Sequence, residues 1–93
     1  MTVALMWEAR AADGRGDELL AWVRRQTPGD GREPLRRETF RAPGDRVLVI
    51  TWWDTESGIG AGVGSGFPEL PDPEPDLVSR PVHRWRFESV GEG

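Results

Sequence analysis

Side chains able to do acid–base chemistry near neutral pH are scarce in this sequence, which contains one histidine, His83, and neither cysteine nor tyrosine. Histidine has the ordinary pKa closest to neutrality, so His83 is the natural general base if a proton has to leave a substrate. A lone histidine on an apolar strand face is more often a packing residue, and both interpretations stay open. One histidine among scattered carboxylates gives no metal-ligand spacing, so we expect no metal site.

Aromatic side chains are abundant, with five tryptophans and three phenylalanines in 93 residues. An apolar pocket that stabilises a developing anion needs aromatic walls and one or two cationic or donor groups. The candidates for lining such a substrate pocket are Trp7, Trp22, Phe40 and Trp85. The candidates for catalysis are Trp52, His83 and Arg86. Each tryptophan has the alternative of being an ordinary core residue.

The segment 82–90 shows the clearest period-two alternation in the chain and predicts a half-buried strand. Its aromatic residues share one face with His83, while Arg84 and Arg86 fall on the other face. Arg86 can therefore share a pocket with His83 only if the strand bulges. The alternative is that the two arginines pair with carboxylates such as Glu38 or Glu8 on a sheet face or at a dimer interface.

Three further elements precede that strand. Residues 2–10 alternate and predict a strand with two mostly apolar faces. Apolar residues then recur at helical spacing, which predicts an amphipathic helix capped by Asp17 and ending near Gln26. The segments 35–41 and 46–53 flank a Pro-Gly pair suited to a type II turn, and so predict a hairpin. Neither face of its second arm is polar, so that strand should be central.

Residues 55–81 contain ten glycines and prolines at the place where a second crossover helix would be expected. A long helix is not expected there, and we interpret the segment as a loop or lid. The chain length allows one domain, over residues 1–93. The expected fold class is α+β, with a ferredoxin-like order β-α-β-β-(loop or short helix)-β and an antiparallel sheet.

The charge and hydropathy of the chain restrict its partners. The formal net charge is -4, whereas a nucleic-acid partner requires a clustered excess of cations and is not expected here. The apolar run at residues 3–7 is too short for a signal peptide or a membrane span, so we expect no membrane partner and a cytoplasmic protein. Because a domain this small has no disulfide to stabilise it, we expect a homodimer, which buries more surface.

The chain resembles the antibiotic biosynthesis monooxygenase (ABM) family of dimeric α/β barrels. The resemblance rests on the order of elements, on the strand RRETFR at residues 36–41 and on the strand VLVITWWD at residues 47–54. In that family a strand of the form apolar-apolar-apolar-x-x-Trp-x-Asp recurs, and Trp52 and Asp54 match it. The resemblance implies that two copies pack sheet to sheet and close a barrel, with one small pocket per subunit between sheet and helices.

The resemblance also implies a function: a cofactor-independent monooxygenase that acts on an aromatic or polyketide-like small molecule, with Trp52 in its site. The sequence departs from the family in having no asparagine and no tyrosine, and its one histidine lies on the last strand. These departures disfavour the haem-degrading branch. Two alternatives stay open: a polyketide cyclase of the same barrel type, and a non-catalytic dimer that binds a hydrophobic small molecule or a partner protein.

Overall fold

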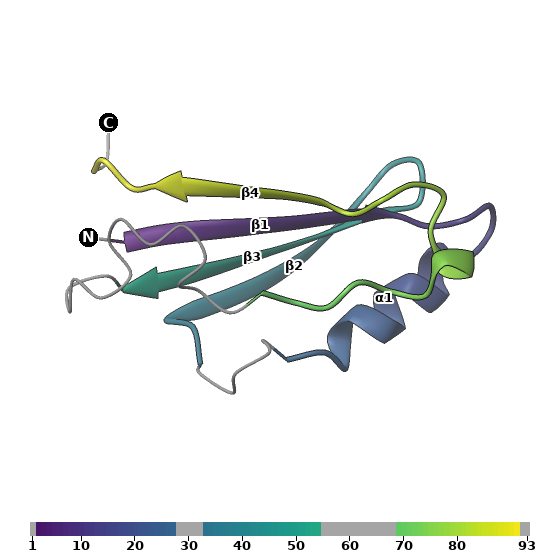
Figure 1. Cartoon of the computed structure of the whole chain (residues 1–93), viewed down its shortest axis with the longest axis horizontal. Coiled ribbons are helices and arrows are strands. Elements are labelled where there is room, and N and C mark those ends of the chain that lie inside the picture. The colour runs from purple at the N-terminus through teal and green to yellow at the C-terminus, as the bar shows by residue number, and fades with distance from the viewer. Residues whose placement is uncertain (1, 28–32, 55–68, 92–93) are drawn as a thin grey trace.

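The computed structural model describes residues 2–27, 33–54 and 69–91. Its elements, in chain order, are β1 (Thr2–Arg10), α1 (Gly16–Arg24), β2 (Arg36–Ala42), β3 (Arg46–Asp54), the short 3-10 helix η1 (Pro75–Leu77) and β4 (His83–Glu88). The four strands form one antiparallel sheet in the order β2-β3-β1-β4. The chain is thus a small α+β protein, and α1 and η1 lie on the same side of its strands (Figure 1).

The register of the strands gives the sheet two distinct faces, because successive side chains of a strand point to opposite sides. Trp7 of β1 pairs with Val49 of β3, and both belong to the buried cluster that contains Leu19 and Val23 of α1. We call the face that carries these residues the helix face. The alternate residues of each strand lie on the opposite side, which we call the open face, and no helix of the described chain lies against it (Figure 1).

The hydrophobic core lies between the helix face and its cover. Beside α1, the cover includes the segment around η1, since Leu70 and Leu77 are buried in the same cluster as Trp7. The proline-rich stretch therefore covers part of the sheet, although its described portion, residues 69–81, holds only one turn of 3-10 helix. The remainder of the predicted loop, residues 55–68, lies outside the described residues.

The predicted cap of α1 is wrong. The helix begins at Gly16, so Asp17 lies within its first turn, and its carboxylate accepts a hydrogen bond from the Arg41 guanidinium at 2.7 Å. The residue at the cap position is Arg15, and its side chain makes no capping hydrogen bond. Asp17 stabilises the helix start through its charge near the positive end of the helix dipole.

The hairpin between β2 and β3 forms as predicted. Gly44 has φ +80°, the conformation that the third position of a type II turn requires and that glycine adopts without strain. The central position of β3, between β2 and β1, is also confirmed.

The prediction that the last strand is half-buried is wrong, because all six residues of β4 are exposed. β4 lies at the edge of the sheet, and one of its faces belongs to the open face. Just before β4 the pairing with β1 is irregular. Glu8 pairs with His83, and Ala11 forms a bridge with Val78. Between these two pairs, residues 9–10 lie opposite the four residues 79–82. This bulge precedes β4 and leaves its alternation unchanged.

Among residues 2–27, 33–54 and 69–91, the helices have neither the length nor the apolar character needed to cross a bilayer.

Candidate functional site

The open face presents three rows of cross-strand neighbours, which follow from the register of the four strands. The row nearest the β2–β3 turn consists of Phe40, Leu48, Glu8 and His83. The middle row consists of Glu38, Ile50, Met6 and Trp85. The third row consists of Arg36, Trp52, Ala4 and Phe87. Eight of these twelve residues are apolar, so the open face is a mainly apolar surface with polar groups at two corners.

The aromatic residues of this face are accessible to solvent. Phe40 is 37% exposed, Trp85 47% and Phe87 52%, values that are high for large apolar side chains. Large apolar surfaces that gather in one place mark sites of interaction with a partner or a ligand. The open face is therefore the candidate functional surface of the molecule.

The structure divides the seven predicted site residues between the two faces of the sheet. Four of them share the open face, namely Trp52, His83, Trp85 and Phe40. Trp7 and Trp22 lie in the layer between sheet and α1, where their rings stack at 6.2 Å. Arg86 pairs with Leu5 and projects on the helix-face side, as the alternation predicts. The seven residues accordingly do not line a common pocket.

Trp52 lies under a cation at one corner of the open face. The Arg36 guanidinium stands 5.0 Å from the centroid of the Trp52 ring and also pairs with the Glu38 carboxylate. A guanidinium over an indole is a stabilising cation–π arrangement. It holds the Trp52 ring in place and neutralises this corner of the face.

Glu8 occupies the opposite corner and was not among the predicted site residues. Its carboxylate accepts a hydrogen bond from Arg80 at 2.6 Å and lies 3.5 Å from the Arg46 guanidinium, and its side chain is only 11% exposed. The hydrogen bond from Arg80 lowers the pKa of Glu8, burial acts in the opposite direction, and the charges of Arg80, Arg46 and His83 lower it further. Glu8 is thus held as a carboxylate. The sequence signal for it was a lone acidic residue in an otherwise apolar strand.

His83 joins this corner to the aromatic surface. Its Nδ1 lies 3.5 Å from Glu8 Oε1, and its ring meets the Trp85 ring edge-on at 5.3 Å. A carboxylate beside one imidazole nitrogen orients the ring and leaves Nε2 for a proton of another molecule. The imidazole is 46% exposed, so such a molecule can reach it from the open face.

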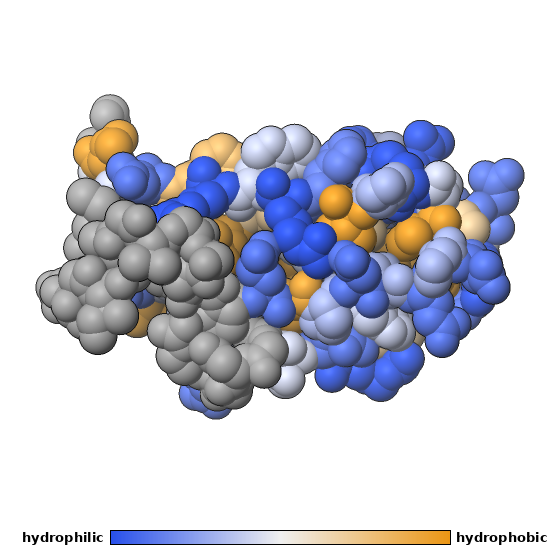
Figure 2. All heavy atoms as spheres, viewed as in Figure 1, coloured by the Kyte–Doolittle hydropathy of each residue, from blue (hydrophilic) through white to orange (hydrophobic). Residues whose placement is uncertain are grey.

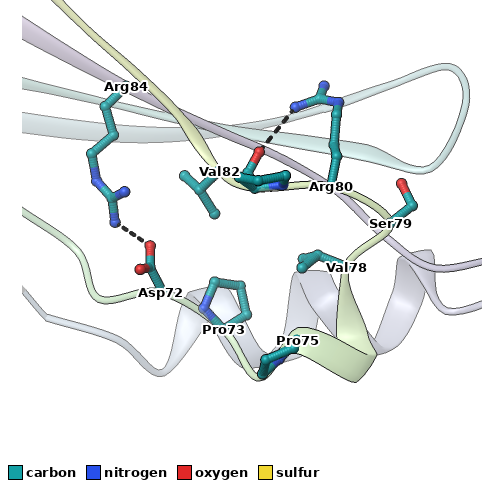
Figure 3. Close-up of a pocket in the computed structure, with 9 residues that line it drawn as sticks. Asp72, Pro73, Pro75, Val78, Ser79, Arg80, Val82 and Arg84 are labelled. Carbon is teal, nitrogen blue, oxygen red and sulfur yellow. Dashed lines mark hydrogen bonds and ion pairs between the residues drawn. The ribbon is translucent and has the colours of Figure 1, made fainter.

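The helix face offers little space near the predicted tryptophans. The cavity beside Trp7 and Thr51 has a volume of about 20 Å³, enough for a water molecule at most. The indole N–H of Trp7 is buried and finds no hydrogen-bond partner among the described residues. A larger pocket of about 480 Å³ lies farther along, between the start of β4 and the segment around η1 (Figure 3). None of the seven predicted site residues lines it.

In the part of the chain that the structure describes, no group of three or more histidine, cysteine or acidic side chains is placed to hold a metal ion. Comparison of the chain with models of known protein families, with curated proteins and with solved structures gives no match.

Proposed function

We propose that the chain is a homodimer whose two open faces pack against each other and hold an aromatic small molecule between them. The observation that carries the proposal is the three-row apolar surface on the side of the sheet against which no helix of the described residues lies. Two such sheets facing each other form the dimeric α/β barrel that the resemblance to the ABM family implies, with each subunit supplying one ferredoxin-like half.

The size of the face is sufficient for self-association. Four strands about 4.8 Å apart and up to nine residues long give a projected area of roughly 500 Å². Two copies would thus bury on the order of 1,000 Å² together, which is the lower bound for a specific protein interface. The apolar rows supply the hydrophobic free energy for this association.

The charges of the face also suit a second copy of the chain. At one corner Arg36 pairs with Glu38, and at the other Glu8 pairs with Arg80 and Arg46. Because each carboxylate already has a cationic neighbour within its own subunit, pairing two faces leaves no carboxylate of these corners buried without a counter-charge. The apolar centre then lies against the apolar centre of the second copy.

An aromatic ligand fits the same surface. Phe40, Trp85 and Phe87 are accessible ring systems on one face, and flat apolar molecules stack on or meet such rings with favourable geometry. Small-molecule sites are mostly apolar with a few convergent polar groups, and His83 is the polar group nearest to Trp85 here.

The tryptophans themselves provide the test. Trp52 and Trp85 lie on the open face, whereas Trp7, Trp22 and Trp53 lie on the helix face or on α1. Dilution that dissociates the dimer transfers Trp52 and Trp85 from the interface to water. The maximum of the tryptophan fluorescence emission should therefore move to longer wavelength. The double variant Trp52→Phe/Trp85→Phe should show no such shift. An emission maximum independent of concentration, or a shift that persists in the double variant, would refute the open-face dimer.

A second candidate, a cofactor-independent monooxygenase, is favoured by the position of His83 between Glu8 and Trp85. Acting on an anthrone-like ring, Nε2 would take a proton from the CH₂ carbon. The carbanion would reduce O₂ to a bound hydroperoxide, which loses water and leaves a carbonyl. The net reaction is CH₂ + O₂ → C=O + H₂O.

Oxygen uptake with anthrone as the probe tests this candidate. His83→Gln should lower the rate at least about a hundredfold, the usual contribution of a general base. Glu88→Gln, a change on the helix-face side of the same strand, is the matched control and should leave the rate unchanged. Absence of uptake by the parent protein would exclude the oxygenase, and turnover of a polyketide-like substrate without oxygen would indicate a cyclase instead.

A further inference from the structure

The pocket at the start of β4 is separate from the open face. It has a volume of about 480 Å³, within the usual range for small-molecule sites, and lies on the side of the sheet that carries η1 (Figure 3). Figure 2 shows this side of the molecule, with apolar residues visible between hydrophilic ones over η1 and the start of β4.

The walls of this pocket are fixed by contacts with the rest of the fold. Val78 bridges Ala11, and the Ser79 amide donates a hydrogen bond to the Arg10 carbonyl at 2.9 Å. Arg84 donates to the Leu70 carbonyl at 3.0 Å, which ties the proline-rich wall to β4. A pocket held in this way is largely preformed, so a ligand does not have to order it.

The interior surface is mainly apolar and includes three proline rings. Pro73 and Pro75 form one wall, Val82 lies across the pocket from them, and Val78 lies at the side next to Pro75 (Figure 3). Proline and valine offer rigid apolar surfaces against which a flat ring can pack. The pocket thus favours a cyclic apolar group.

The polar atoms of the lining are acceptors more than donors. Proline has no backbone N–H, which removes that donor at three lining positions, Pro73, Pro75 and Pro81. The Arg80 guanidinium turns away from the pocket and donates to Glu8 and to the Pro81 carbonyl (Figure 3). The donors of Arg84 are directed to the Leu70 carbonyl and to carboxylates.

The most exposed charge at the rim of the pocket is that of a carboxylate. The Arg84 guanidinium lies between two carboxylates, 2.7 Å from Asp72 and 3.4 Å from Glu69. The pocket lining contains two arginines, but Arg80 and Arg84 are only 27% and 31% exposed and already pair with carboxylates, whereas the Asp72 side chain is 73% exposed at the mouth of the pocket. A positively charged group is therefore the electrostatic complement of this rim.

We propose that this pocket binds a small cyclic amine, with its apolar ring between the two prolines and the two valines and its ammonium group at the Asp72 carboxylate. The proposal stands whether or not the open face forms a dimer, because none of the five lining residues named here belongs to that face.

Amide chemical shifts of the ¹⁵N-labelled chain test the proposal with three isosteric probes. The cation 1-naphthylmethylamine should shift the signals of Val78, Ser79, Val82 and Arg84, the neutral 1-naphthylmethanol should do so more weakly, and the anion 1-naphthoate should not. Asp72→Asn should weaken binding of the amine on the order of tenfold, which is the effect of losing one charge-assisted contact.

The matched control is Asp76→Asn, the same exchange in the same segment at a residue that does not line the pocket. It should leave the affinity for the amine unchanged. Equal binding of the naphthoate, equal weakening by the two variants, or shifts confined to open-face residues such as Met6 and Trp85 would each overturn the proposal.

Discussion

Glu8 is the residue through which the chemistry and the stability of the open face are coupled. It brings together Arg80 from the bulge, Arg46 from β3 and His83 from β4, all of which are far from Glu8 in the sequence. Sequence reasoning selected His83 because of its residue type. It named Glu8 only as a possible partner of Arg84 and Arg86, because the cross-strand register that places Glu8 beside His83 is not visible in a single strand. An isolated carboxylate in an apolar strand was the available signal.

Replacement of Glu8 by glutamine tests its structural contribution. The variant leaves Arg80 and Arg46 without their shared acceptor, and we expect a loss of about 1–3 kcal/mol in the free energy of unfolding at neutral pH. Because the folded state lowers the pKa of Glu8, this stabilisation is present above the pKa of an unfolded glutamate and disappears as the pH falls through the folded value. The difference between parent and variant should therefore shrink on acidification below about pH 4.

Urea unfolding at one protein concentration, at neutral pH and at about pH 3, measures that difference. Glu38→Gln is the matched control, since Glu38 is more exposed and pairs with Arg36 at the surface. It should change the stability by less than about 1 kcal/mol. A difference between parent and Glu8→Gln that stayed constant with pH would contradict the assigned role.

At the scale of the elements, the alternation and turn chemistry of the sequence were enough to place the strands. The span Thr2–Arg10 was predicted to the residue, and the Pro-Gly turn was placed correctly. The start of α1 was missed because the helix begins at Gly16 with no side-chain cap, whereas sequence rules place a helix start at a capping side chain. The burial of β4 was misjudged because the sequence does not indicate which side of a sheet receives a cover.

The end of α1 depends on a side chain of β2. The Arg37 guanidinium donates to the Gln26 carbonyl at 2.6 Å and to the Val23 carbonyl at 2.9 Å. The Val23 carbonyl also accepts from the Gln26 amide at 3.0 Å, so Arg37 is a second donor at this helix end. Burial lowers the pKa of Arg37, yet a guanidinium remains protonated at any working pH. This strand residue therefore completes the last turn of the helix.

Arg37→Met keeps the apolar stem of the side chain and removes both hydrogen bonds. We expect a loss of about 1–2 kcal/mol and faster hydrogen exchange of the amides in the last turn of α1. Arg41→Met is the matched control on the same strand, because Arg41 pairs with a solvent-exposed Asp17 and should contribute less than about 1 kcal/mol. Equal destabilisation by the two variants, with unchanged exchange in α1, would show that Arg37 does not hold the helix end.

At the scale of the whole molecule, α1 and the segment around η1 cover one side of the sheet, and the other side carries apolar rows against which no helix of residues 2–27, 33–54 and 69–91 lies. In β1 and β3, both alternating sets of residues are mostly apolar, so the sequence predicted that both faces of these strands are covered. It did not specify which face the helix would cover. The pocket beside η1 was also beyond sequence reasoning, because it depends on the path of the proline-rich segment and on the hydrogen bond from Arg84 to the Leu70 carbonyl.

The most direct measurement of the central claim is sedimentation equilibrium of the parent and two charge variants. Trp85→Glu places a carboxylate in the middle row of the open face, whereas Val90→Glu makes a comparable change at a residue that is 92% exposed and outside the strands. The account predicts a dimer for the parent and for Val90→Glu and a folded monomer for Trp85→Glu. A parent that sediments as a monomer, or a Trp85→Glu variant that remains dimeric, would contradict it.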